Sequence, residues 1–202
     1  MADSMDLSVP EWRRELPVLS SRAVTLREPM PTDLVTLCDV LSLADAAAFG
    51  IDDPISEVSA LDFINRVARQ RAAGAAFAFA VTANASRSTV GLMYVRQLDP
   101  AFEAGEWEAT LVPSARGTGM FLDAARLVGS FAFGIVGTHR LEARVPVQDG
   151  RANGALRKLG AVQEGVLRRS IRRGGQYLDQ VLWSILKEDW GEHWVATAPR
   201  VH

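Results

Sequence analysis

The stretch Trp107–Gly137 joins a short apolar strand to an amphipathic helix through a turn that contains two glycines. Residues 107–112 read Trp-Glu-Ala-Thr-Leu-Val, and Pro113 ends this strand because proline has no N–H for the ladder of a sheet. Arg116-Gly117-Thr118-Gly119 follows, and apolar residues then recur at helical spacing as far as Ile135. The sequence therefore predicts a strand, a tight turn and a helix in immediate succession.

A helix that begins at such a turn is a favourable place for a phosphate group. The first N–H groups of a helix have no internal partner, and the macrodipole places partial positive charge at this end. Gly117 and Gly119 leave these groups uncovered, and Arg116 adds a guanidinium that can pair with phosphate oxygens. The pattern lacks the Lys-Ser/Thr of a P-loop and the third glycine of a dinucleotide fingerprint. A turn that needs its glycines only for chain geometry is the alternative reading.

Residues 116–121, Arg-Gly-Thr-Gly-Met-Phe, resemble the Arg/Gln-x-x-Gly-x-Gly/Ala motif of the GNAT superfamily of acyl-CoA N-acyltransferases. The resemblance continues through His139–Val145, Asn153–Gly160 and Glu164–Arg168, and through the ending Gly175–Trp190. Together these segments are similar to the RimJ/RimL-like branch, which acetylates protein N-termini and other primary amines. The resemblance spans about residues 18 to 190 and is carried mostly by the C-terminal half.

This resemblance implies an α/β fold of the GNAT type, a central mixed and mostly antiparallel sheet of seven strands with helices on both faces. Residue periodicity places elements in a compatible order. Strands are expected at 22–27, 76–81, 90–95, 107–112, 141–145, 162–171 and 177–186. Thr32 is expected to cap the first helix, Ser59 to open a second that ends at Gly74, and residues 151–159 to form a short helix.

At 202 residues the chain has the length of one domain. We expect an N-terminal tail or arm over 1–18, with Trp12 as its anchor, a single domain over 19–190 and a C-terminal tail over 191–202. The N-terminus lacks the apolar core of a signal peptide, and the longest apolar tract, 121–137, is too short to span a bilayer comfortably. These features predict that no membrane is involved.

Charge and side-chain chemistry exclude several classes of partner. The net charge of −2 gives no general reason to expect nucleic acid or an anionic membrane surface. The single cysteine, Cys38, cannot form an internal disulfide, which fits a reducing cytoplasm. The three histidines, His139, His193 and His202, show no metal-ligand spacing, so no metal is expected.

The resemblance implies acetyl-CoA as co-substrate and assigns residues to hold it. The backbone of Leu111 and Val112 is expected to pair with the pantetheine arm. The amides of Arg116, Gly117, Thr118, Gly119 and Met120 are expected to hold the pyrophosphate, with the Arg116 side chain assisting. Asn153 is a further candidate for cofactor binding. In this superfamily the region around Phe49, Asp52 and Asp53 usually lines the acceptor side, which makes these residues acceptor-site candidates, although a solvated loop is the favoured interpretation.

The catalytic carboxylate is less well defined. Many relatives carry a glutamate eleven residues before the Arg/Gln of the motif, and this chain has Gly105 there. Glu103 shares the strand face of residue 105, and a bulge would turn Glu106 toward that face. We therefore predict Glu103 and Glu106 as catalytic candidates.

Two functions follow from these assignments. The first is an N-acetyltransferase that moves an acetyl group from acetyl-CoA directly to a primary amine, in a protein N-terminus or a small molecule, within a ternary complex. The alternative is a CoA-binding or regulatory module of the same fold without turnover, suggested by Gly105, Ala152 and Leu156 at positions where relatives carry functional side chains. The acceptor is an amine of unknown identity, and the last strands of this fold often pair subunits, so a homodimer is possible.

Overall fold

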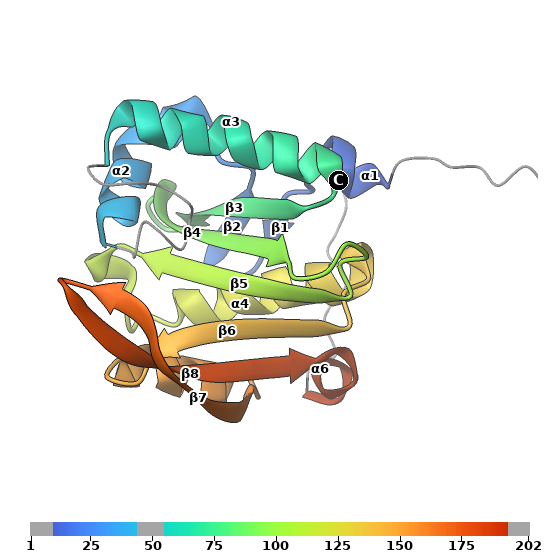
Figure 1. The fold of residues 1–202 in the computed structure, drawn as a ribbon. Helices are drawn as coiled ribbons and strands as arrows, with labels where there is room; N and C mark the ends of the chain where they lie inside the picture. Colours follow the sequence, from blue (N-terminus) through green and yellow to red (C-terminus); the bar gives the residue numbers. More distant parts are fainter. Residues whose placement is uncertain (1–9, 44–54, 194–202) are drawn as a thin grey trace, which may run out of the picture.

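A single mixed sheet forms the centre of the computed structural model, which describes residues 10–43 and 55–193 (Figure 1). Within those residues the sheet has eight strands in the order β1-β2-β3-β4-β5-β6-β8-β7. The strands are β1 (Leu19–Ser20), β2 (Val24–Arg27), β3 (Ala76–Ala83), β4 (Ser88–Gln97), β5 (Ala104–Leu111), β6 (Arg140–Pro146), β7 (Val162–Arg173) and β8 (Gln176–Leu186). The helices are α1 (Glu11–Arg14), α2 (Leu34–Leu43), α3 (Glu57–Ala73), α4 (Met120–Phe131), α5 (Gly150–Lys158) and α6 (Lys187–His193).

Helices cover both faces of the sheet, as the sequence predicted. Side chains alternate along a strand, so Phe77 and Phe79 of β3 point to one face and Ala76 and Ala78 to the other. The phenylalanine face packs against α4, and the alanine face packs against α2 and α3. The described helices α2 and α3 lie over β3 and β4 rather than over β6 and β8 (Figure 1).

The pairing of β5 with β6 differs from every other pairing in the sheet. It is parallel, whereas the other described neighbours are antiparallel. It also has only three rungs among the described residues, Ala104↔Arg140, Gly105↔Leu141 and Glu106↔Glu142. The two strands therefore diverge beyond Glu106 and leave a gap beside the second half of β5.

Most predicted elements are confirmed, and the differences are local. The sheet has eight strands rather than seven because the two-residue strand β1 pairs with β2. Helix α3 begins at Glu57 and its cap is Ser56, whose hydroxyl accepts a hydrogen bond from the Ser59 N–H at 3.1 Å, so the predicted cap, Ser59, was three residues late. Thr32 lies inside the 3-10 turn Pro31–Asp33 that precedes α2, and the prediction that it caps the helix was wrong.

The bulge that would have turned Glu106 toward the face of Gly105 is absent. The β4–β5 register runs without a shift from Gly91↔Leu111 to Gln97↔Gly105. Regular alternation therefore holds along β5. Gly105 and Trp107 face α4, and Glu106 faces the side of the sheet on which α2 and α3 lie.

The described part of the expected N-terminal arm packs on the domain. Trp12 of α1 is buried, and its ring lies edge-on to Phe77 and Phe102 with centroids 6.0 and 6.2 Å apart. The Leu16 N–H donates to Glu28 Oε1 at 3.1 Å, which ties the segment to the end of β2. At the other end, Trp190 of α6 is also buried and packs against Gly129 of α4.

A buried carboxylate anchors the start of α2 to the sheet. Asp33, 4% exposed, accepts two hydrogen bonds from the Arg27 guanidinium, each 2.7 Å long. It also accepts from the Thr89 hydroxyl at 2.7 Å and from the Met30 N–H at 2.8 Å. Burial by itself would raise the pKa of Asp33, but these hydrogen bonds and the charge of Arg27 outweigh it and hold the pKa below its usual value.

We expect Asp33→Asn to lower the free energy of unfolding by about 2–3 kcal/mol, because Arg27 would lose its buried counter-charge. The folded pKa of Asp33 is depressed, so its contribution is complete above the unfolded pKa and is lost as pH falls through the folded pKa. Urea denaturation of both proteins between pH 7 and pH 3 measures this difference. Asp62→Asn, at an exposed position of α3, is the control, and an equal loss in both variants would contradict the prediction.

Candidate active site

The gap beside β5 exposes one edge of that strand. The Val112 N–H donates to the Val90 carbonyl at 2.8 Å, which makes Leu111 and Gly91 a pair without direct hydrogen bonds to each other. In an antiparallel ladder such pairs alternate, so the N–H and C=O groups of Ala109 and Leu111 point away from β4 and toward the gap. These backbone groups form a strand edge that an extended, amide-bearing ligand could extend.

The turn at the open end of the gap has the backbone that the sequence predicts. Gly117 and Gly119 have φ angles of +78° and +90°, a region that favours glycine. Both are exposed, and a Cβ at either position would meet no described atom within 4 Å. Gly119 caps α4 without a side-chain hydrogen bond. The turn before α4 is therefore exposed, and the Met120 N–H makes one long contact, 3.5 Å, to the Thr118 hydroxyl oxygen.

The remaining residues of the turn are held by internal contacts. The Thr118 hydroxyl donates to the Ala115 carbonyl at 2.6 Å. The exposed Arg116 side chain folds back so that its Nε donates to the Leu111 carbonyl at 2.9 Å. One of the backbone groups expected to pair with pantetheine is thus already bonded to Arg116, and the N–H of Val112 is bonded within the sheet. Ala109 was not predicted as part of the site, although it lies two residues before Leu111 and therefore presents its backbone groups to the same edge of the strand.

Asn153 has an internal role, which differs from the cofactor contact that the resemblance implied. Its side chain is 8% exposed. Its Nδ2 donates to the carbonyls of Pro146 at 3.0 Å and Asp149 at 2.8 Å, and its Oδ1 accepts from Trp183 Nε1 at 2.8 Å. The amide therefore joins α5 to the end of β6 and to β8, and both of its ends are satisfied inside the chain.

The structure places the two predicted catalytic carboxylates in different surroundings. Glu103 is exposed in the bend before β5, at the end of the strand where β5 and β6 are still paired. It lies five residues before Glu108, a carboxylate in the second half of β5, or about 16 Å along an extended strand. Glu106 is 2% exposed, and its carboxylate forms ion pairs with Arg96 of β4 and, at 3.4 Å, with Arg144 of β6. Neither carboxylate is open to a ligand at the far end of the gap.

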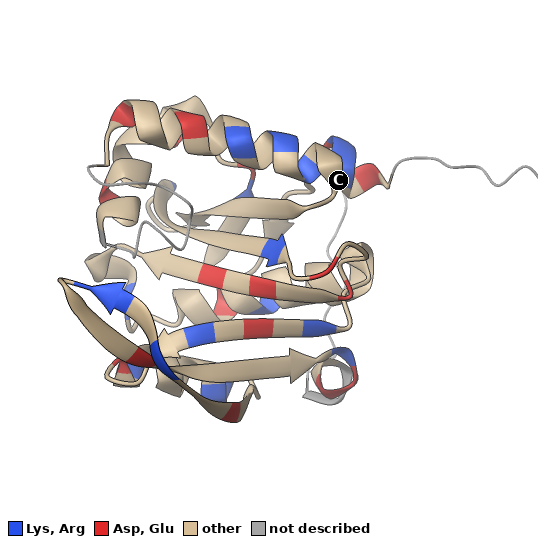
Figure 2. Ribbon diagram, in the orientation of Figure 1, with Lys and Arg blue, Asp and Glu red and all other residues tan. Residues whose placement is uncertain are grey.

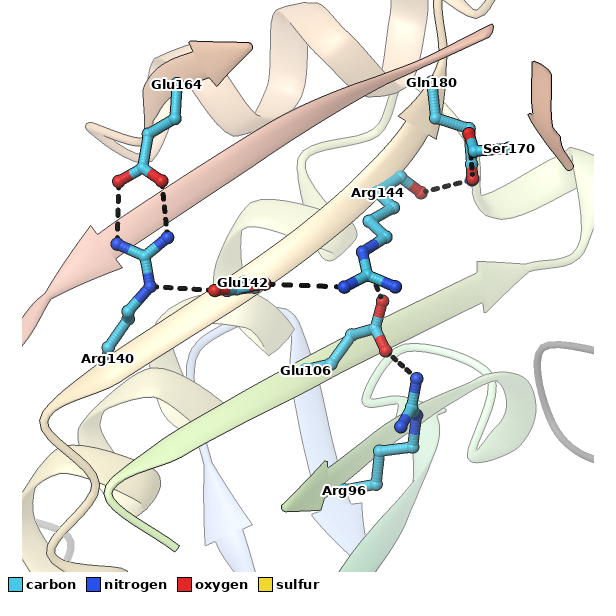
Figure 3. Close-up of polar contacts among 8 residues, drawn as sticks. All are labelled: Arg96, Glu106, Arg140, Glu142, Arg144, Glu164, Ser170 and Gln180. Atoms are coloured by element: carbon cyan, nitrogen blue, oxygen red, sulfur yellow. Dashed lines mark hydrogen bonds and ion pairs between the residues drawn. The ribbon is translucent and has the colours of Figure 1, made fainter. Parts of the chain in front are cut away.

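Glu106 belongs to a larger set of alternating charges that crosses four strands (Figure 3). We call this set the arginine–glutamate chain, and its members in spatial order are Arg96, Glu106, Arg144, Glu142, Arg140 and Glu164. Figure 2 shows β5 with red bands of acidic residues, and β6 beside it with a red band between blue ones. Apart from Glu106, none of these side chains was assigned a role from the sequence, because the pairs Glu106–Arg144 and Arg140–Glu164 join residues far apart in the chain.

The arginine–glutamate chain ends in a bidentate pair. Arg140 donates to both carboxylate oxygens of Glu164 at 2.7 and 2.5 Å, and its Nε donates to Glu142 at 2.9 Å. The Ser184 hydroxyl also donates to Glu164, at 2.6 Å. Hydrogen bonds from Arg140 and Ser184 lower the pKa of Glu164 to about 2.

Comparisons with known proteins agree with this geometry. The family model described as acetyltransferase (GNAT) domain matches residues 23–162, which is more than half of the chain. The chain therefore belongs to the GNAT acetyltransferase family and is an acyl-CoA N-acyltransferase, as the resemblance indicated. No curated protein matches the chain.

Three solved structures share the fold over most of their length. Ribosomal-protein-S5-alanine acetyltransferase from Vibrio fischeri is 18% identical, with 86% of this chain and 98% of that chain covered and a TM-score of 0.74. Mycobacterium smegmatis RimJ in complex with CoA-disulfide is 21% identical, with 86% and 87% covered and a TM-score of 0.72. A spermidine N-acetyltransferase SpeG chimera from Vibrio cholerae and hSSAT is 20% identical, with 83% and 97% covered and a TM-score of 0.70.

Two further observations concern the described residues alone. No helix among them is both long and apolar enough to cross a membrane. No group of three or more His, Cys, Asp or Glu side chains in this part of the chain could hold a metal ion. The acceptor-side candidates Phe49, Asp52 and Asp53 lie outside the described residues.

We expect Glu164→Gln to destabilise the protein at neutral pH, because Arg140 would lose its bidentate partner. The folded pKa of Glu164 is about 2, below its ordinary value, so its stabilising effect is complete above about pH 4.5 and declines toward pH 2. Chemical denaturation of wild type and variant at pH 7, 5, 4 and 3 should show two stabilities that converge as the pH falls. A constant difference at every pH would contradict this assignment.

Proposed function

We propose that this chain transfers the acetyl group of acetyl-CoA directly to a primary amine in a ternary complex. The observation that carries the proposal is the gap between β5 and β6, which leads along a free strand edge to the uncovered start of α4. In this proposal the pantetheine arm lies along Ala109 and Leu111. The pyrophosphate lies against the amides from Gly117 to Met120, and the Arg116 guanidinium supplies a positive charge beside it.

The reaction needs a neutral amine next to the thioester. The amine nitrogen attacks the carbonyl carbon, the C–S bond breaks, and CoA leaves as a thiolate while the amine loses a proton. An alkylamine has a pKa of about 10.4, so presenting it neutral at pH 7 costs roughly 4–5 kcal/mol. Holding two bound substrates in reactive geometry can supply a comparable or larger amount. Positioning is therefore the main contribution that this site has to make.

The position of Glu108 supports it as the group that accepts the amine proton. It is half-buried on β5 opposite Tyr94, on the same face as Glu106. It lies two residues past the last β5–β6 rung and so borders the gap, unlike Glu103. Glu106 is enclosed by Arg96 and Arg144 and is part of the arginine–glutamate chain.

Calorimetric titration with acetyl-CoA, followed by thiol release with a panel of amines, tests the proposed function. The panel should contain peptides with free N-termini and polyamines, because the acceptors in the names of the fold relatives belong to these two classes. Binding with release of CoA supports the transferase. Binding without release by any amine supports the alternative, a CoA-binding module without turnover, which the enclosed carboxylate of Glu106 favours. Absence of binding to the folded protein would contradict both.

Gly119→Asp should weaken acetyl-CoA binding far more than Gly119→Asn. The two side chains have nearly the same size and the same backbone strain at φ +90°, but only aspartate places a negative charge where the pyrophosphate is proposed to lie. We expect at least a tenfold difference in Kd, or about 1.4 kcal/mol. Calorimetry of both variants measures it. Equal affinities would place the phosphates elsewhere.

Glu108→Gln should lower kcat about 100-fold at pH 7, the scale typical of a lost general base, with little change in the Kd of acetyl-CoA. The rate of the variant should rise with pH, because more of the free amine is then neutral. Steady-state kinetics with an accepted amine, at several pH values, provides the measurement. Glu103→Gln serves as the comparison, since Glu103 lies at the far end of β5. A wild-type rate for Glu108→Gln would remove Glu108 from the mechanism.

A further inference from the structure

One side-chain contact crosses the gap at the point where β5 and β6 begin to diverge. The last backbone rung pairs Glu106 with Glu142. Arg144 lies two residues further along β6, and its Nε reaches back to Glu106 Oε1 at 3.4 Å (Figure 3). Arg96 of β4 holds the other carboxylate oxygen of Glu106. The carboxylate is therefore fixed from both sides of β5, by strands that are not neighbours of each other.

Burial makes this arrangement rigid. The Glu106 side chain is 3% exposed, whereas those of Arg144 and Arg96 are 37% and 42% exposed. Separating a buried carboxylate from its guanidinium partners is costly, because the charge loses its compensation without regaining full hydration. The contact between Glu106 and Arg144 therefore resists any widening of the gap at this point.

The narrow end of the gap is bounded on both faces of the sheet. On the α4 face lie Trp107 and Ala143, each 5% exposed and part of the hydrophobic core. On the opposite face lie Glu106 and Arg144. These four side chains border the narrow end of the gap, Trp107 and Ala143 on one face of the sheet and the Glu106–Arg144 ion pair on the other.

We propose that the Glu106–Arg144 pair determines which acyl groups the site accepts, by limiting the space at the narrow end of the gap to a short chain. The inference rests on the proposed function. If the pyrophosphate lies at Gly119 and the pantetheine arm along Leu111 and Ala109, the thioester points down the strand toward Trp107. That distance is four residues of strand from Leu111, or about 13 Å. Glu106 is then a positioning residue, which acts on the bound acyl group through Arg144.

Titration calorimetry with acetyl-CoA and butyryl-CoA tests the inference without requiring the acceptor amine. We expect wild type to bind acetyl-CoA at least about tenfold more tightly than butyryl-CoA, since a single methylene in a restrictive pocket is typically worth 10-fold or more. Arg144→Met removes the charge that holds Glu106, and Glu106→Gln removes the carboxylate charge with little change of shape. Both should bring the ratio of the two Kd values close to one. Arg144→Lys keeps the positive charge and should restore part of the preference.

A matched control separates the shape of the gap from stability in general. Glu164→Gln breaks an ion pair of the same arginine–glutamate chain, but Glu164 lies on β7, which is separated from the gap by β6 and β8. Glu164 stands at a register shift of the β7–β8 pairing, between Gln163 and Gly165. The substitution should lower stability and leave the ratio of Kd values unchanged. Denaturation curves establish that each variant is folded, and if Glu106→Gln does not fold, the two Arg144 variants decide the matter.

Two results would overturn the inference. The first is an unchanged ratio in folded Arg144→Met and Glu106→Gln, and the second is an equal change in Glu164→Gln. Failure of the proposed function gives a different result, because wild type would then bind neither thioester. In that case the inference falls together with the proposal on which it rests.

Discussion

The early end of the β5–β6 ladder is the constraint on which the candidate site depends. A sheet normally satisfies the N–H and C=O groups of an internal strand on both sides, but β5 has no β6 partner over its second half, where Arg116 bonds to the Leu111 carbonyl instead. The groups of Ala109 and Leu111 consequently face a gap inside the sheet rather than a neighbouring strand. A ligand with amide groups can complete the ladder there, and the start of α4 lies where such a ligand would emerge.

The arginine–glutamate chain compensates for the missing backbone pairing on one face. The described helices α2 and α3 pack mainly on β3 and β4, so the corresponding face of β6 and β8 has no apolar cover from them. Three arginines and three glutamates alternate across this face, and each carboxylate contacts at least one guanidinium. Charges that are partly buried are tolerated when they are paired in this way. The same pairing encloses the carboxylate of Glu106 between Arg96 and Arg144.

Sequence reasoning succeeded where the decisive interaction is local. Pro113, Gly117 and Gly119 act through their own backbone, and a strand, a turn and a helix form around them in the predicted order. The bounds differ, since β5 begins at Ala104 rather than Trp107 and α4 gives way to a π-helical segment at Ala132. It was less accurate where two local signals compete, as with Ser56 and Ser59, either of which could open α3. The two-residue strand β1 carries too little pattern to be detected, and it exists because β2 offers a free edge.

The amino-acid sequence by itself determined the order of the elements, the glycine turn and the family, because these follow from residues close together in the chain. Only the tertiary structure decided what the polar side chains do. The buried carboxylate of Glu106 is paired with Arg144 of β6. The side-chain oxygen of Asn153 accepts a hydrogen bond from Trp183 of β8. Neither contact has a signature in the sequence, since the partners are thirty or more residues apart and meet only when the strands pair. The physical reason is that the hydrogen-bond partners and the exposure of a charge or an amide depend on the groups around it, and folding brings those groups together.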